Sequence, residues 1–184
     1  MKLIGLLILL SLFGAQTSNV TLSFSPEAEK YAEATKQYQS IWQSEGEKII
    51  KAMEEVSGLR FQPMDIRAIV YEGASFSGFK DTPMKLRASY PSMDIKREAL
   101  VHELGHRLNE SIKVRPKDVD DHRVLFLYLY DVWVKLYGKK FADDMVEIEK
   151  GRKGLYDYES AWNWALSLSA QERASKLKEI VEKK

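Results

Sequence analysis

The spacing of apolar residues predicts a strand followed by a long helix in the N-terminal third of the chain. Val, Leu and Phe alternate with polar residues over 19–24, which favours a short strand. From Ser25 to Gly58 the apolar residues recur at spacings of three and four, as in an amphipathic helix. Ser25 suits its N-cap and Pro26 its first turn, while a gap in the pattern around Gly46 favours a bend.

The pattern then changes to alternation over two further stretches, 64–73 and 84–91, which we predict to be strands. Between them lies a loop rich in Gly and Ser, residues 73–83, whose Phe76 and Phe79 make it either the rim or lid of a cleft or an ordinary surface loop. The strand at 84–91 is expected to border that cleft, where an extended peptide could pair with it.

Everything after residue 93 has helical periodicity. The segments expected to be helical are 94–110, 120–137, 139–150, 157–168 and a last helix opened by the capping box Ser169/Glu172. Apolar residues cover nearly the whole circumference of 120–137, which predicts a central buried helix. The expected fold class is α+β: a small twisted, mostly antiparallel sheet with a long N-terminal helix and a C-terminal helical part.

The chain is long enough for one hydrophobic core, so a single domain over residues 19–184 is expected. Its 28 basic and 27 acidic residues give a net charge of +1, which does not favour binding to nucleic acid. The absence of cysteine excludes disulfides and thiolate metal ligands. Any transition-metal site must therefore use His, Asp or Glu.

Residues 1–18 have the layout of a secretory signal peptide, with Lys2 before an apolar run to Phe13 and then small and polar residues. The apolar run is about half of the roughly 20 residues that a membrane-spanning helix needs. We therefore expect an exported, extracytoplasmic chain, periplasmic or secreted, with no stable membrane span once the signal is removed.

The segment H-E-L-G-H carries the strongest indication of chemistry, because it holds two of the three histidines of the chain. On a helix, His102 and His106 lie on one face and can offer their ring nitrogens to one metal ion. Zinc suits such a pair, and the adjacent Glu103 can act as a general base without binding the metal. Hydrogen-bonded structural histidines are the alternative interpretation.

A catalytic zinc normally has three protein ligands and one open position. The remaining histidine, His122, stands sixteen residues after His106 at the start of the next predicted helix, and a loop of about nine residues can fold it back. We predict His122 as the third ligand. Glu147 is the next choice; the other carboxylates that could serve are Asp121, Asp131 and Glu149.

The segments VHELGHRL and DDHRVLF resemble those of the zincin metallopeptidases, and their layout is similar to that of SprT-like and related short zincins. The resemblance covers roughly residues 64–137. It implies a zincin-like fold with His102, His106 and His122 as zinc ligands and Glu103 as base. The longer metzincin pattern is not met, because it needs a glycine and a histidine where the chain has Asn109 and Ile112.

These features predict a zinc metallopeptidase, a hydrolase that cleaves peptide or protein substrates with a zinc-activated water. Tyr156 or Tyr158 could donate a hydrogen bond to the oxyanion, and the sequence does not select between them. Two alternatives stay open: a non-catalytic zinc-stabilised binding domain of the cell envelope, and hydrolysis of a non-peptide amide.

Overall fold

The structure is a computed structural model that describes residues 20–79, 81–114, 119–154 and 156–182. Its elements follow the order β1 (Val20–Pro26), a 3-10 turn (Glu29–Tyr31), α1 (Ala32–Ser57), β2 (Met64–Tyr71), β3 (Met84–Arg87), α2 (Met93–Asn109), α3 (Asp121–Tyr137), α4 (Lys139–Lys150), α5 (Tyr158–Leu166) and α6 (Ala170–Glu182). The α+β class is thus as expected. The proposed signal segment 1–18 lies outside the described residues.

The sheet is parallel, with the strands in the order β1-β2-β3. Leu22 pairs with Ile66, and Ala68 pairs with Met84. Alternate residues of all three strands are buried, so one face of the sheet contributes to the core. The long helix α1 connects β1 to β2, as a parallel pair requires a crossover.

The expectation of a mostly antiparallel sheet is wrong, because the loop between β2 and β3 doubles back. Its residue Phe76 pairs antiparallel with Lys85 on the far side of β3, with N···O distances of 3.0 and 2.9 Å. The chain leaves β2, passes the outer edge of β3, turns, and returns as β3 between the two. The antiparallel partner of β3 is therefore the loop itself, and β3 runs parallel to β2.

The N-terminal boundary also differs from the prediction. Ser25 and Pro26 continue β1, paired with Ile69 and Val70, instead of starting the helix. The helix α1 begins only after the 3-10 turn and runs unbroken through Gly46. A Cβ at Gly46 would lie 2.8 Å from the Trp42 ring, so close packing by that ring accounts for a glycine here.

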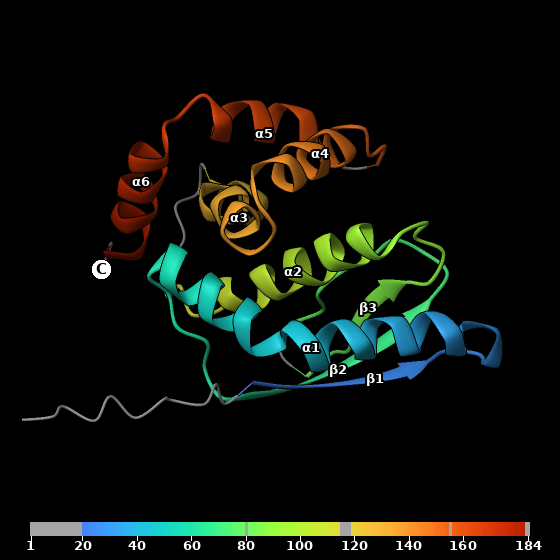
Figure 1. Ribbon diagram of the computed structural model, residues 1–184. Coiled ribbons are helices and arrows are strands. Elements are labelled where there is room, and N and C mark those ends of the chain that lie inside the picture. Colours follow the sequence, from blue (N-terminus) through green and yellow to red (C-terminus); the bar gives the residue numbers. More distant parts are fainter. Residues whose placement is uncertain (1–19, 80, 115–118, 155, 183–184) are drawn as a thin grey trace, which may run out of the picture.

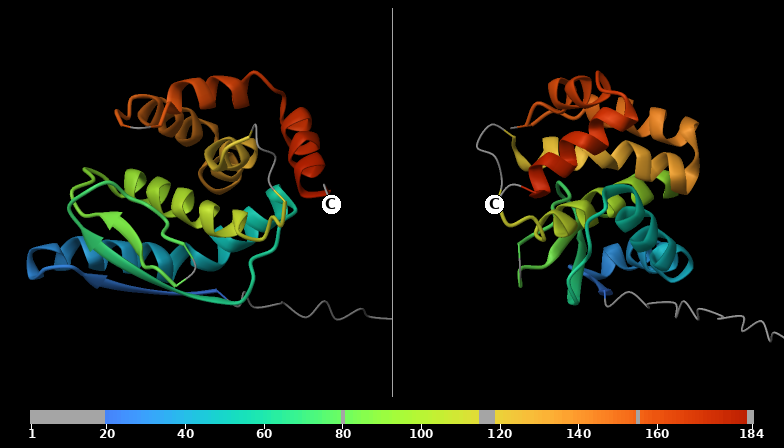
Figure 2. Two further views of the ribbon diagram at one scale, coloured as in Figure 1. Left: turned by 180° about the vertical axis from the view of Figure 1, so that it is seen from behind. Right: turned by 90° about the vertical axis from the view of Figure 1, so that its left-hand side faces the viewer.

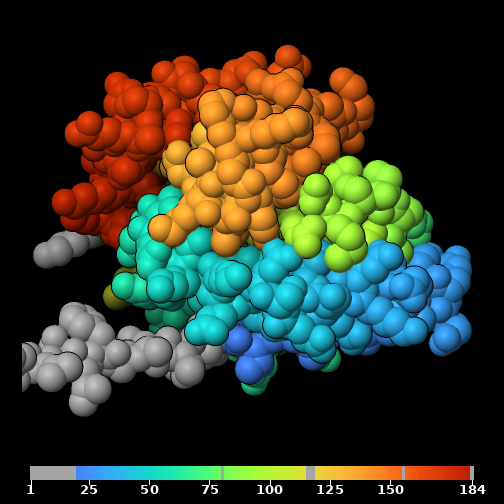
Figure 3. All heavy atoms as spheres, in the orientation of Figure 1, coloured from blue at the N-terminus to red at the C-terminus, as the bar shows by residue number. Residues whose placement is uncertain are grey.

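The elements form three layers (Figure 1). The sheet lies on one side, α1 and α2 in the middle, and α3 to α6 on the far side, an arrangement that the two other views also show (Figure 2). Both α1 and α2 contact α3. In the space-filling view the side chains of α1 meet those of the C-terminal helices along one face of the molecule (Figure 3).

Helix α3 is the central buried helix that its apolar composition predicts, and it contacts every other α-helix. The capping box of α6 is also present: Ser169 N donates to Glu172 Oε2 at 2.7 Å, and Glu172 N donates to Ser169 Oγ at 3.3 Å. Among the described residues, no helix combines the length and the apolar composition needed to cross a membrane.

Candidate metal centre

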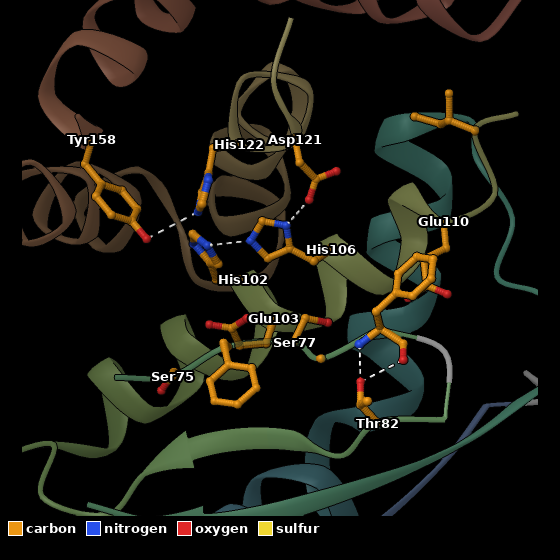
Figure 4. A pocket seen from close by; sticks show the side chains of 14 residues that line it. Ser75, Ser77, Thr82, His102, Glu103, His106, Glu110, Asp121, His122 and Tyr158 are labelled. Atoms are coloured by element: carbon orange, nitrogen blue, oxygen red, sulfur yellow. Dashed lines mark hydrogen bonds and ion pairs between the residues drawn. The ribbon is translucent and has the colours of Figure 1, made fainter. Parts of the chain in front are cut away.

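Helix α2 carries the H-E-L-G-H segment along the floor of a pocket of about 860 Å³. The side chain of Ser92 caps the helix by accepting a hydrogen bond from Ile95 N. His102, Glu103 and His106 all line the pocket, together with His122 from the first turn of α3. The close-up view shows the three imidazole rings gathered together, with Glu103 below them (Figure 4).

The three histidines meet at one point: one ring nitrogen from each lies within 4.8 Å of those from the other two. His102 Nε2 and His106 Nε2 are 3.1 Å apart. The ring centroid of His122 lies 5.4 Å from that of His102 and 4.7 Å from that of His106. The helix α3 thus folds back over α2 as the spacing between His106 and His122 predicted.

A carboxylate lies behind each histidine of α2. Glu149 Oε1 is 2.6 Å from His102 Nδ1, and Asp121 Oδ2 is hydrogen-bonded to His106 Nδ1. A carboxylate only accepts hydrogen bonds, so both Nδ1 atoms carry hydrogen and both Nε2 atoms present lone pairs to the shared point. Carboxylates in this position fix the tautomer and the orientation of metal-binding histidines.

The distance between His102 Nε2 and His106 Nε2 fits two ligands of one tetrahedral metal ion. Two nitrogens bound to zinc at about 2.0–2.1 Å lie about 3.3 Å apart when the geometry is tetrahedral. The 3.1 Å between His102 Nε2 and His106 Nε2 is close to that separation. Three neutral imidazoles form a donor set that suits zinc.

The surroundings keep two of the three imidazoles neutral. Burial, reinforced by the neighbouring His106, holds the pKa of His102 well below its usual range. Burial and the other two histidines lower the pKa of His122 to about 3. Burial also acts to lower the pKa of His106, but the hydrogen bond to Asp121 and the nearby Glu103 carboxylate outweigh it and raise that pKa. A proton on His106 and a metal cation would therefore compete for the same point.

The carboxylates considered as rival third ligands do not join the group of three histidines within the described residues. Glu147 is exposed and pairs with Lys150. Asp131 holds the guanidinium of Arg173. Asp121 and Glu149 approach the rings from the Nδ1 side instead.

An arginine side chain contacts the second group of possible ligands, which consists of Glu98, His102 and Glu149. Arg152 donates to Glu149 Oε1 at 3.1 Å and to Glu98 Oε2 at 2.7 Å. The guanidinium places a positive charge beside two fully buried carboxyl groups, while burial, with the neighbouring Glu149, holds the pKa of Glu98 well above its usual range. Through Glu149, this group supports His102.

Three residues of this support were not identified as such from the sequence. Glu149 was named only as a possible ligand, although it continues the buried stripe Ala142, Met145, Val146 of α4, a spacing that points its side chain inward. Trp162 belongs to no motif that the sequence analysis singles out. It stacks on Phe126 with ring centroids 3.9 Å apart, and its Nε1 also donates to Glu149 Oε2 at 2.6 Å. Arg152 is the third, and the sequence assigns it no role.

Glu103 has the surroundings of a general base. Its Oε2 atom is buried and has no hydrogen-bond partner among the described residues, while the side chain lines the pocket. Burial raises the pKa of Glu103 to about 7, against the attraction of His106 and Arg152. A carboxyl group with a pKa near neutrality can both take and return a proton.

The structure distinguishes the two candidate tyrosines. The Tyr158 hydroxyl lies in the pocket 3.2 Å from His122 Nε2, and burial raises its pKa to about 12, so it keeps its proton at neutral pH. The Tyr156 hydroxyl instead donates to Asp120 Oδ1 at 2.7 Å. The Tyr156 ring stacks on His122 with centroids 4.1 Å apart.

The segment 75–79 forms the pocket wall opposite the histidines. The strand β3 was expected to border the cleft, but none of its residues lines the pocket. Phe76 uses its N–H and C=O to pair with Lys85. Because successive residues of an extended strand direct these groups to opposite sides, those of Ser75 and Ser77 point away from β3. The cleft edge is thus this segment, which the sequence presented as a loop.

Comparison with protein-family models, with curated proteins and with solved structures finds no match. Function is therefore inferred from the geometry of the pocket.

Proposed function

We propose that the protein is a zinc-dependent metallopeptidase with a zincin-like fold, which acts outside the cytoplasm. The observation that carries the proposal is the meeting of His102, His106 and His122 in a pocket that Glu103 also lines. Two of these histidines have a carboxylate on Nδ1, the arrangement that favours metal binding through Nε2.

The residues of the pocket divide the chemistry among them. When bound, zinc would supply the Lewis acid that polarises a carbonyl and lowers the pKa of water. Glu103 takes the proton of the attacking water and returns it to the leaving amine. Tyr158, held near His122, donates a hydrogen bond to the carbonyl oxygen as that oxygen becomes negative.

The edge segment 75–79 gives the pocket a means of holding an extended peptide. The main-chain groups of Ser75 and Ser77 that point away from β3 can pair with a substrate backbone, which places a peptide bond across the pocket. Main-chain pairing of this kind favours a peptide over a small amide.

The proposal is tested with purified chain beginning near residue 19, loaded with one equivalent of zinc. The wild type, Glu103→Gln and Glu110→Gln are incubated with a mixture of peptides, and new termini are identified by mass spectrometry. Glu110 lines the same pocket and serves as the matched control. We expect cleavage by the wild type and by Glu110→Gln, and at least about a 100-fold loss in Glu103→Gln with zinc retained.

Cleavage by Glu103→Gln at the wild-type rate would remove Glu103 from its role. A wild type that binds zinc and cleaves no peptide would contradict the peptidase proposal and favour a non-catalytic zinc domain.

A further inference from the structure

Two exposed aromatic side chains lie at the rim of the pocket. Phe76 is 49% exposed and Phe79 is 61% exposed, and both line the pocket that holds the histidines. No other aromatic residue of the described part is as exposed. Exposing large apolar side chains has a free-energy cost, and their concentration beside a cleft is typical of a binding surface.

The segment that carries these rings is held in place. Thr82 N donates to Phe79 O at 3.0 Å, and Thr82 Oγ1 accepts a hydrogen bond from Phe79 N. Arg107 of α2 donates to Thr82 O at 2.7 Å, which ties the turn to the helix of the metal centre. Gly78 has φ of 72°, and a Cβ there would lie 2.7 Å from Pro83 O, so the turn requires glycine.

The charges of the pocket limit what can bind beside the rings. The carboxyl groups that line it are those of Glu103, Glu110 and Asp121. The described lining residues include no lysine or arginine. An acidic substrate side chain beside the rings would lose hydration without gaining a lysine or arginine partner from the lining, whereas an uncharged apolar one would bury surface against the phenylalanines and Ile112.

We propose that Phe76 and Phe79 form a specificity surface that selects peptides with an aromatic or large aliphatic residue next to the cleaved bond and no acidic residue beside it. The proposal rests on the proposed peptidase function and names its substrate class. A peptide paired along residues 75–77 directs alternate side chains to the same side, which brings one of them next to the exposed rings.

The test uses matched peptides that differ at one position beside the cleaved bond, which carries Phe, Leu, Ala or Glu. For the zinc-loaded wild type we expect kcat/KM for the Phe and Leu peptides to exceed that for Ala by about 10-fold or more, with Glu the poorest. In Phe76→Ala and Phe79→Ala this ratio should fall towards one while zinc content is unchanged. Val181→Ala, an exposed apolar residue on α6, is the control and should keep the wild-type ratio.

Binding separates this proposal from the peptidase proposal. Fluorescently labelled versions of the same peptides are titrated onto zinc-loaded Glu103→Gln, with and without Phe76→Ala, and anisotropy is measured. Tighter binding of the Phe and Leu peptides, lost with Phe76→Ala, supports the specificity surface even where no peptide is cleaved. Equal binding of all four peptides, or a preference that survives Phe76→Ala, overturns it.

Discussion

Glu149 lies 2.6 Å from His102 Nδ1, although 47 residues separate the two in the chain. Glu149 is fully buried on α4, where Arg152 and Trp162 fix its carboxylate from the other sides. The C-terminal helices therefore support the cluster of three histidines. They determine which nitrogen His102 presents to the pocket.

Replacing Glu149→Gln should weaken zinc binding by about 10- to 100-fold. The neutral amide orients the His102 ring less firmly than the carboxylate does, and it removes the negative charge that makes the imidazole a stronger metal ligand. Glu147→Gln is the control, since Glu147 lies on the same helix but is exposed. Competition with a chromophoric zinc chelator measures both affinities. Equal affinities in the two variants would show that the carboxylate behind His102 has no influence on the metal.

Replacing His122→Ala should reduce zinc affinity by more than about 100-fold. This loss exceeds the one expected for a residue that only hydrogen-bonds to a ligand, as Glu149 does. Asp131→Asn removes a carboxylate that was a rival for the third position and should leave zinc affinity unchanged, because Asp131 binds Arg173. The same chelator competition reports both. Wild-type affinity in His122→Ala would assign the third position to another residue.

Replacing Tyr158→Phe should lower kcat by about 100-fold or more, the usual effect of removing one donor to an oxyanion. KM and zinc content should stay near the wild-type values, since the ring remains. Tyr156→Phe removes only the hydroxyl that binds Asp120 and is the matched control. Steady-state kinetics on one cleaved peptide decides; a comparable loss in both variants would argue against a direct role for the Tyr158 hydroxyl.

Replacing Gly105→Ala should lower the free energy of unfolding by about 1–3 kcal/mol. A Cβ at Gly105 would lie 2.2 Å from Leu125 Cδ1, at a point where α2 and α3 approach closely and Tyr128 Oη donates to Gly105 O. Gly154→Ala, where nothing lies within 4 Å of the new Cβ, should change it little. Urea denaturation measures both, and equal stabilities would contradict the close packing of the two helices.

The sequence predicted those parts of the site that depend on position along one helix or on a short return of the chain. The spacing of His102 and His106 places them on one face of α2, and the loop before His122 is short enough to bring it back. The capping box at Ser169 also depends only on residues three apart.

What escaped prediction depends on the packing of distant segments. Whether Glu147 or Glu149 reaches the site is decided by how α4 lies against α2, and the side chain of Glu147 is 72% exposed while that of Glu149 is fully buried. The sheet was expected to be mostly antiparallel, but β3 pairs parallel with β2, and the loop before β3 folds back so that Phe76 pairs antiparallel with Lys85. Alternation of apolar residues is the same in either case.

X-ray absorption at the zinc edge tests the three-histidine site directly on the chain loaded with one equivalent of zinc, for the wild type and His122→Ala. We expect three imidazole nitrogens at about 2.0–2.1 Å and one further light ligand in the wild type, with one imidazole fewer in the variant. A spectrum without imidazole ligands, or one that His122→Ala leaves unchanged, would contradict the three-histidine centre.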